Sequence, residues 1–449
     1  MRKPENPPDF ADILSDPQIF ERLQPLIQQA GADENYLHWD KIRRLRPPQG
    51  FTSREWWTAI KIARLSKFRT LSLKDSYGHP FRFSTPDSIQ RFLHQSDLSL
   101  GGQIDVPQEI LNPETRNRYL VSSLIQEAIT SSQLEGAVTT REIAKAMLLS
   151  GRKPRDESEQ MILNNYRTMS RIQTLRNEPL SESLVLSLHA NVTEGTLKSP
   201  DMAGRYRLPT EDICVADIEG EVFHVPPAAS QLPERMQAMC DFANVVTPRG
   251  FIHPVIRAII LHFWLAYDHP FVDGNGRTAR ALFYWAMLRQ GYWLFEFISI
   301  SDILRQAPAK YARAFLYSET DDNDLTYFIV HQAQVIQRAV QALHDYIAHK
   351  TAEIHAAEGV LRDVEHFNHR QITLLSHALR HPGTLYTIEG HQRSHNTVYE
   401  TARRDLTLLA EADVLVEVKR GRKKTFRAPA DLQERIEKYV RIRRQLDDL

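Results

Sequence analysis

The sequence predicts a mostly α-helical protein in which one small β-hairpin interrupts a long series of helices. Apolar side chains recur at helical spacing through most of residues 115–346, and residues 326–358 predict one long helix that bridges two domains. The exception is residues 211–227, which alternate apolar and polar around Glu219-Gly220 and stop at Pro226-Pro227. This alternation predicts a hairpin. A hairpin in an otherwise helical domain indicates a role beyond packing.

Length and composition limit the class of protein. A chain of 449 residues suggests about two to four domains. Its 42% hydrophobic and 25% charged residues are typical of a soluble globular protein, and a net charge of zero gives no global attraction to nucleic acid or membrane. No apolar segment follows Met1, and Cys214 and Cys240 show no metal-site or disulfide pattern. We therefore expect a cytoplasmic protein without membrane contacts.

The first 105 residues predict a separate N-terminal unit. They are rich in Trp, Phe and Arg, and a Pro-Pro-Gln-Gly stretch at residues 47–50 interrupts them. Helical patterns cover residues 53–67 and 88–95. We expect the aromatic side chains of this unit to form its core.

Residues 269–280 read His-Pro-Phe-Val-Asp-Gly-Asn-Gly-Arg-Thr-Ala-Arg, a combination suited to phosphate chemistry. His269 can take a proton from a nucleophile, and the Asp273 carboxylate can hold Mg²⁺ against phosphates. A Gly-Asn-Gly turn exposes backbone N–H groups that can bind an anion, and Arg277 and Arg280 match spread negative charge. A polar turn between two helices would explain the glycines but not the base, the carboxylate and both arginines.

The flanks of this run place it between two helices. Residues 251–267 predict a buried helix that ends near His269, and residues 277–290 predict a second helix. The run is therefore a loop that opens onto a helix N-terminus, where the helix dipole already favours an anion. Phe271 lies between polar positions, and we expect it to anchor the loop in the core.

The run resembles the signature of Fic-domain proteins, His-x-Phe-x-Asp/Glu-Gly-Asn-Gly-Arg-x-x-Arg, and matches every specified position. Such enzymes transfer AMP from ATP to a hydroxyl side chain of a target protein and release pyrophosphate. The resemblance implies an all-helical Fic core with a β-hairpin flap over residues 106–350, with ATP as co-substrate and Mg²⁺ as cofactor. The implied roles are general base for His269, metal ligand for Asp273, phosphate cradle for Gly274, Asn275 and Gly276, and phosphate contacts for Arg277 and Arg280.

In the family, the flap lies over the active site and pairs with an extended segment of the target, which presents its Ser, Thr or Tyr hydroxyl to the histidine. Edge pairing of this kind is a common mode of peptide recognition. The resemblance places Val222, Phe223 and His224 where the flap meets ATP, although the sequence here matches the family only approximately. Tyr311 is the matching aromatic candidate beside the nucleotide.

A second motif lies upstream of the catalytic run. Residues 131–136 read Ser-Ser-Gln-Leu-Glu-Gly and match the inhibitory pattern Ser/Thr-x-x-x-Glu-Gly/Asn of the family. The resemblance implies that Glu135 pairs with Arg280 and occupies the place of the ATP γ-phosphate, as a charge-assisted pair would. A glutamate before a glycine helix cap is the plain structural alternative. Because both motifs occur in one chain, we favour an intramolecular brake.

The C-terminal part predicts a winged helix-turn-helix domain over residues 365–430, followed by a helical tail over residues 431–449. Helical patterns at residues 368–381 and 391–412 precede an alternating stretch at 414–419 and a second short strand at 425–428. The intervening hairpin would carry Lys419, Arg420, Arg422, Lys423, Lys424 and Arg427. Such a domain binds DNA with a helix in the major groove, or it recruits a protein. The sequence leaves both partners open.

The leading hypothesis is an autoinhibited protein adenylyltransferase. Two alternatives remain: a de-AMPylase in which Glu135 positions a water, and a DNA-binding regulator whose Fic domain senses nucleotide. An intact His269 argues against the last, because a sensor needs no base. The sequence does not decide whether the protein modifies itself or forms a homodimer.

Overall fold

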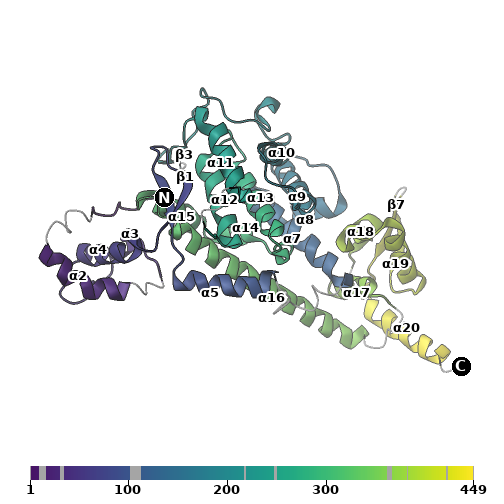
Figure 1. Cartoon of the computed structure of the whole chain (residues 1–449). Coiled ribbons are helices and arrows are strands. Elements are labelled where there is room, and N and C mark those ends of the chain that lie inside the picture. The colour runs from purple at the N-terminus through teal and green to yellow at the C-terminus, as the bar shows by residue number, and fades with distance from the viewer. Residues whose placement is uncertain are drawn as a thin grey trace.

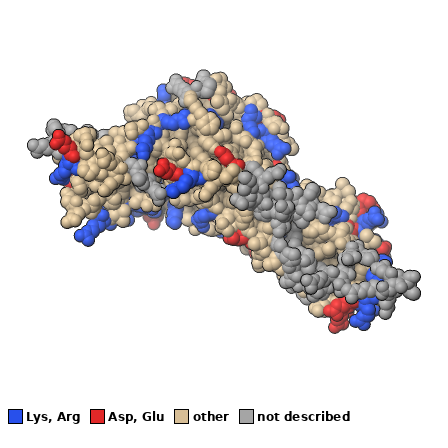
Figure 2. Space-filling model, turned by 60° about the horizontal axis from the view of Figure 1, so that its bottom comes forward, with Lys and Arg blue, Asp and Glu red and all other residues tan. Residues whose placement is uncertain are grey.

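The computed structural model describes residues 2–9, 17–30, 35–101, 113–216, 219–246, 250–361, 367–381, 383–420 and 423–447. Within these ranges the protein is mostly helical with small antiparallel sheets, as predicted. Figure 1 shows a central helical body with a smaller unit at each end. No helix in the described ranges combines the length and apolarity that a membrane span requires. On the face shown in Figure 2, basic and acidic side chains are interspersed.

The N-terminal unit contains helices and one hairpin. Its elements are α2 (Pro17–Ala30), α3 (Trp39–Ile42), α4 (Ser53–Leu65), β1 (Arg69–Lys74), β2 (Pro80–Phe83) and α5 (Asp87–Ser96), followed by a π-helical turn (Asp97–Gly101). The two helices predicted in this unit correspond to α4 and α5. The hairpin β1–β2 was not predicted. The expected domain boundary at residue 105 lies outside the described residues.

A buried ion pair fastens this unit to the central body. Lys61 of α4 donates to Asp321 at 2.6 Å, and both side chains are 1% exposed. Asp321 also accepts a hydrogen bond from the Tyr327 hydroxyl at 2.7 Å. Removing one partner of such a pair leaves a buried charge without compensation, so these contacts hold the two units in one arrangement.

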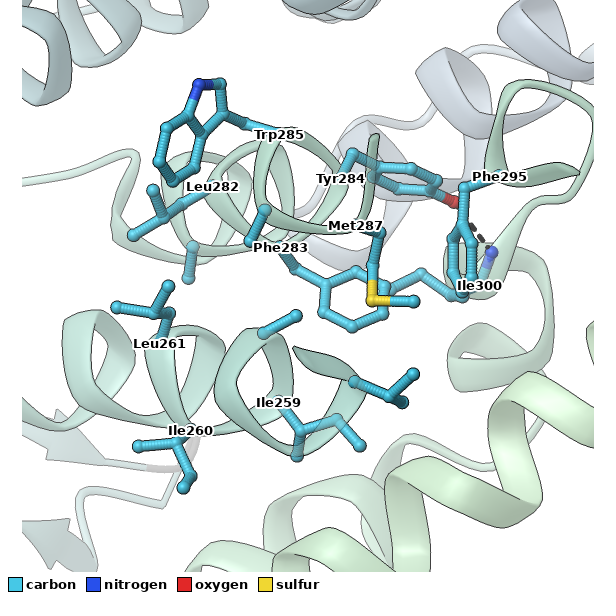
Figure 3. Close-up of a cluster of buried hydrophobic side chains, with 14 of the residues drawn as sticks. Ile259, Ile260, Leu261, Leu282, Phe283, Tyr284, Trp285, Met287, Phe295 and Ile300 are labelled. Atoms are coloured by element: carbon cyan, nitrogen blue, oxygen red, sulfur yellow. Dashed lines mark hydrogen bonds between the residues drawn. The ribbon is translucent and has the colours of Figure 1, made fainter. Parts of the chain in front are cut away.

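The central body is a set of helices around α12 and α13. Its helices are α7 (Pro113–Leu134), α8 (Arg141–Ser150), α9 (Glu157–Leu175), α10 (Glu182–Thr193), α11 (Leu232–Asn244), α12 (Pro254–Asp268), α13 (Asn275–Arg289), α14 (Ile300–Gln306), α15 (Pro308–Thr320) and α16 (Thr326–Leu361). Helices α12 and α13 are buried along almost their whole length. Figure 3 shows Phe283 and Met287 of α13 pointing toward α12, while the Tyr284 hydroxyl accepts from the Ile300 amide at 2.9 Å.

The predicted hairpin lies beside the C-terminal end of α12, where the His224 ring contacts the Tyr267 carbonyl. It consists of β3 (Val215–Ala216) and β4 (Val222–His224), which pair antiparallel with Val215 opposite His224. Part of the turn between the strands, residues 217–218, lies outside the described residues. The long helix predicted over residues 326–358 is α16.

The C-terminal domain combines helices with a three-stranded sheet in the order β5-β7-β6. Its elements are α17 (His369–Arg380), β5 (Leu385–Thr387), α18 (Ile388–His395), α19 (Tyr399–Glu411), β6 (Val416–Arg420), β7 (Lys423–Arg427) and α20 (Leu432–Asp447). The strands β6 and β7 cover the two stretches that the sequence predicted as strands, and α20 is helical within residues 431–449. The turn residues 421–422 lie outside the described residues.

The single helix predicted over residues 391–412 is wrong. The chain forms α18 and α19 instead, separated at Asn396, whose φ of 46° is left-handed. Asparagine tolerates this conformation better than most residues, so the chain turns there without a glycine or proline.

Candidate active site

His269 occupies the C-terminal cap of α12. Its backbone is left-handed, with φ 45° and ψ 55°, and its amide donates to the Leu265 carbonyl at 3.0 Å. This turn ends the helix and places the imidazole at the mouth of the loop that leads to α13. Because the ring Nδ1 lies 3.3 Å from the Ala266 carbonyl oxygen, Nδ1–H donates there and Nε2 remains the acceptor.

The loop from His269 to α13 is closed on itself by Asn275. The side-chain oxygen of Asn275 accepts from the Phe271 amide at 2.9 Å, and its NH₂ donates to the Phe271 carbonyl at 2.8 Å. Phe271 is fully buried, as predicted, and stacks on the His189 ring with centroids 3.7 Å apart. The Asn275 side chain therefore shapes the loop, while its backbone lies in the first turn of α13.

His189 holds the same loop from α10. Its Nδ1 accepts from the Gly204 amide at 3.0 Å, so its Nε2 donates to the Asp273 carbonyl at 2.9 Å. Burial lowers the pKa of His189 to about 4, which keeps this ring neutral. Sequence reasoning missed this residue.

Gly274 and Gly276 are required by the close approach of neighbouring groups. Gly274 has φ +82°, and a Cβ there would lie 2.6 Å from the Thr193 methyl carbon. A Cβ on Gly276 would overlap the Glu135 carboxylate. Gly274 caps α13, and its amide donates to the Asp273 carboxylate at 2.6 Å, whereas the first-turn N–H groups of Asn275 and Gly276 have no intrahelical partner. This is the expected geometry of an anion site.

Asp273 and Arg277 form a pair with unequal exposure. The Arg277 guanidinium is buried and donates to the Val192 carbonyl at 2.8 Å and to Asp273 at 3.2 Å. The Asp273 side chain is 54% exposed. In the part of the chain that the structure describes, no three His, Cys, Asp or Glu side chains cluster as a metal site. A single exposed carboxylate beside an anion site fits Mg²⁺, which takes one or two carboxylates plus phosphate oxygens.

Arg280 lies one turn further along α13 and is held by the C-terminal end of α7 and the residue after it. Its Nε donates to the Ser131 hydroxyl at 2.9 Å, and one terminal nitrogen donates to the Ser131 carbonyl at 2.9 Å and to Glu135 at 2.8 Å. Arg280 is 2% exposed and Glu135 24%. Burial alone would lower the pKa of Arg280, but the Glu135 carboxylate holds it above its usual value.

Glu127 provides a further contact between helices α7 and α13. Glu127 is buried in α7 and accepts from the Tyr284 hydroxyl of α13 at 2.9 Å and from the Ser299 hydroxyl at 2.8 Å. Glu127, Ser131 and Glu135 are spaced four residues apart, and so are their partners Tyr284 and Arg280 on α13. The side chains at this spacing share one helix face, so the three contacts fix the position of α7 along α13.

The flap is joined to the histidine loop by Arg207 and His224. Arg207 donates to the His269 carbonyl at 2.9 Å and to the Pro227 carbonyl. Both ring nitrogens of His224 face acceptors, Glu319 at 2.8 Å and the Tyr267 carbonyl at 2.7 Å. Burial alone would lower the pKa of His224, but these two partners raise it. His224 thus fastens the flap base, while Val222 and Phe223 lie further out, with Val222 exposed.

Tyr311 approaches Arg280 from α15. Its hydroxyl lies 2.8 Å from Nε2 of His262, a fully buried residue of α12. Burial raises the pKa of Tyr311 to about 12, so the phenol stays protonated. Tyr311 therefore lies beside Arg280 and His262.

Comparison with known proteins agrees with this geometry. Residues 179–287, which include the flap and the loop from His269 to Arg280, match the Fic/DOC family model. This part of the chain is therefore similar to the Fic/DOC family. Glu135 and the C-terminal domain lie outside the matched residues.

The chain spans less than half the length of the curated relatives that it matches. The protein adenylyltransferase Fic of Nematostella vectensis is 30% identical over 183 residues, which cover 39% of this chain and 40% of that protein. The protein adenylyltransferase Fic of Drosophila willistoni is 42% identical over 69 residues, 15% of this chain and 14% of that protein. Among solved structures, a Fic family protein from Desulfovibrio desulfuricans G20 superposes with a TM-score of 0.47 at 19% identity, covering 76% of this chain and 94% of that chain.

The pKa values of His269 and His224 should be shifted in opposite directions from the ordinary value of histidine. Burial lowers the pKa of His269 to about 4, and the positive charges of His224 and Arg207 act in the same direction. We expect NMR signals of the His269 ring to stay those of a neutral imidazole as the pH falls to about 5, well below the ordinary value near 6.5. The His224 ring should remain protonated above that value and lose its proton only as the pH rises further.

The variants His269→Asn and His224→Gln would assign the two sets of signals. A titration midpoint of His269 near 6.5 would contradict the buried, neutral base.

Because the folded state raises the pKa of His224, the contribution of this residue to folding stability should be complete below about pH 6.5. It should be lost as the pH rises through the raised pKa.

Proposed function

We propose that the protein is an autoinhibited protein adenylyltransferase, which transfers AMP from ATP to a Ser, Thr or Tyr hydroxyl of a target protein and releases pyrophosphate. The observation that carries the proposal is the loop from His269 to Arg280, in which a neutral base, an exposed carboxylate and a helix N-terminus lie together. The similarity to proteins named adenylyltransferases supports the reaction class.

In the proposed reaction, the target hydroxyl oxygen attacks the α-phosphorus of ATP. A new P–O bond forms to the side chain, the bond between the α-phosphorus and the bridging oxygen breaks, and pyrophosphate leaves. The hydroxyl proton passes to Nε2 of His269, since Nδ1 donates to the Ala266 carbonyl. Mg²⁺, held by Asp273, would neutralise charge on the phosphates. The N–H groups of Asn275 and Gly276 would stabilise the α-phosphate as charge develops.

The contacts of Arg280 support the autoinhibition. The γ-phosphate of ATP needs a cation, and Arg280 is engaged by Glu135 at 2.8 Å. A carboxylate and a phosphate oxygen cannot occupy the same donor. ATP that still binds would therefore lack the contact that aligns its α-phosphate with His269.

His269→Ala should abolish AMP transfer and leave the thermal transition within a few degrees of wild type. The imidazole makes one hydrogen bond of 3.3 Å, to the Ala266 carbonyl, so its loss removes one weak polar contact. Because alanine is strained at φ 45°, His269→Asn serves as a second variant with the same loss of activity and a better fit to the backbone. Transfer of labelled AMP in the Glu135→Gly background measures both. Labelling at the parental rate would exclude His269 as the base.

Asp273→Ala should lose AMP transfer unless Mg²⁺ is raised greatly, because the remaining groups offer the metal no charged ligand. Asp273→Glu should restore part of the activity, and EDTA should stop the parental enzyme. Glu194→Ala, which removes another exposed carboxylate, is the control and should change nothing. Activity that persists in EDTA would remove Asp273 from the reaction.

Glu135→Gly should increase AMP transfer, visible as self-labelling without the true target. A single charge-assisted contact contributes about 1.5–3 kcal/mol, so simple competition for Arg280 predicts an increase of about 10- to 150-fold. Arg280→Ala should be inactive with or without Glu135→Gly, since the arginine is needed once the carboxylate is gone. Unchanged transfer, together with loss of AMP removal from a modified target, would instead establish a de-AMPylase in which Glu135 positions water.

A further inference from the structure

A cavity of about 410 Å³ lies where the N-terminal unit meets the central body. Its walls come from β1, α11 and the first turn of α12, and Figure 1 shows β1 beside α11, against which it packs. Arg257 lines the cavity from the N-terminal end of α12, whereas His269 caps the other end of this helix, roughly 18 Å further along its axis. The cavity is therefore separate from the candidate active site.

Two arginines of this cavity have no carboxylate partner among the described residues. Arg69 of β1 donates to the Phe251 carbonyl at 2.5 Å, and Arg257 of α12 donates to the Phe242 carbonyl at 2.6 Å. Each of these contacts uses one terminal nitrogen, and a guanidinium carries five N–H donors. Both side chains are only partly exposed. The remaining donors of both groups can therefore bind a ligand in the cavity.

The lack of a carboxylate partner distinguishes these two arginines from several others in the protein. Four arginines that are 13–27% exposed each contact a carboxylate within 2.8 Å: Arg152 with Glu159, Arg205 with Glu211, Arg235 with Asp268, and Arg370 with Asp405. In the cavity, by contrast, burial lowers the pKa of Arg257, and the positive charge of Arg69 lowers it further. An anion between the two guanidiniums would relieve this repulsion.

Aromatic rings hold both guanidiniums in place. The central carbon of the Arg69 guanidinium lies 5.5 Å from the centre of the Phe83 ring, and that of Arg257 lies 4.8 Å from the centre of the Phe242 ring. A cation over a ring face is attracted electrostatically. Because a carbonyl and a ring already fix each guanidinium, little side-chain freedom is lost when a ligand binds. Two fixed forks of N–H donors suit a carboxylate, which accepts pairs of parallel hydrogen bonds.

The rest of the lining fits a ligand with one negative charge and an apolar body. Of the described residues that line the cavity, Arg69, Arg257 and Asp241 are charged, which leaves one positive charge in excess. The Asp241 carboxylate accepts from the Gln237 side chain at 2.8 Å and does not pair with either arginine. The lining also includes apolar side chains, among them Leu71, Phe242 and Ile252.

We propose that this cavity binds a small apolar monocarboxylate, whose carboxylate lies between Arg69 and Arg257 and whose apolar part lies against β1 and α11. The volume is within the range of small-molecule sites, which is about 300–1,000 Å³. A phosphate dianion matches the single excess charge less well. The proposal does not depend on the adenylyltransferase activity.

Ligand-observed NMR of the full-length protein tests this proposal, with phenylacetate as the probe and phenylacetamide as its neutral match. The carboxylate should bind at least about ten-fold more tightly than the amide, because hydrogen bonds to a charged group are stronger. Arg69→Gln and Arg257→Gln should each weaken phenylacetate binding about ten-fold and leave the weak binding of the amide unchanged.

Arg289→Gln is the matched control. Arg289 also donates to a carbonyl, that of Glu178 at 2.6 Å, and lies 5.5 Å from the centre of the Trp285 ring, but it does not line the cavity. This variant should bind phenylacetate as the wild type does. A loss of affinity equal to that of Arg69→Gln would show unspecific charge attraction and contradict the proposal.

Asp241→Asn separates loss of the site from loss of the fold. It removes the negative charge from the cavity, so it should strengthen phenylacetate binding several-fold, which damage to the fold would not do. Arg257→Lys keeps the charge but loses the fork of donors, and its affinity should lie between those of Arg257→Gln and the wild type. Equal affinities for the acid and the amide would overturn the proposal. Tighter binding of inorganic phosphate than of phenylacetate would overturn it as well, and so would the absence of saturable binding at millimolar phenylacetate.

Discussion

The burial of Arg280 is the constraint on which the rest of the site depends. A guanidinium that is 2% exposed needs acceptors, because a buried charge without a partner is strongly destabilising. Ser131 and Glu135 supply three of them, from the end of α7 and just beyond it. Helix α7 is therefore part of the site, and in the proposed mechanism the carboxylate can leave Arg280 only when another anion takes its place. The γ-phosphate of ATP is such an anion.

The same reasoning explains why two neighbouring histidines, His269 on the loop and His224 at the flap base, favour opposite charge states. His269 is largely buried with a single weak acceptor, so its neutral form is favoured. His224 is also buried, but both nitrogens face acceptors, one of them the Glu319 carboxylate, so its charged form is favoured. The charge of His224 in turn helps keep His269 neutral. The flap base thus contributes to the chemistry of the loop through electrostatics as well as through position.

What the sequence could predict depended on how far apart the interacting residues lie along the chain. The loop from His269 to Arg280 is contiguous, so a local pattern and the helix N-terminus were enough. His189, Arg207 and Glu127 reach their partners Asp273, His269 and Tyr284 across 84, 62 and 157 residues, and no local pattern marks them. The hairpin β1–β2 did carry a signal, since Leu71 and Leu73 alternate with polar residues, but its strands are short. The break between α18 and α19 depends on one asparagine in a left-handed conformation, which helical periodicity does not register.

Helix α7 connects two parts of the molecule that the sequence presented as separate. Its C-terminal end supplies Ser131 and is followed by Glu135 at Arg280, and Glu127 fixes its position along α13. Its other contacts include α17 and α18 of the C-terminal domain. Because a packed helix moves largely as a rigid element, a shift of the C-terminal domain cannot reach Arg280 without also straining the buried Glu127 contacts. Moving α7 therefore costs free energy. A partner of the C-terminal domain could act on the site through α7 only if it bound the displaced arrangement of that domain more tightly than the arrangement seen here.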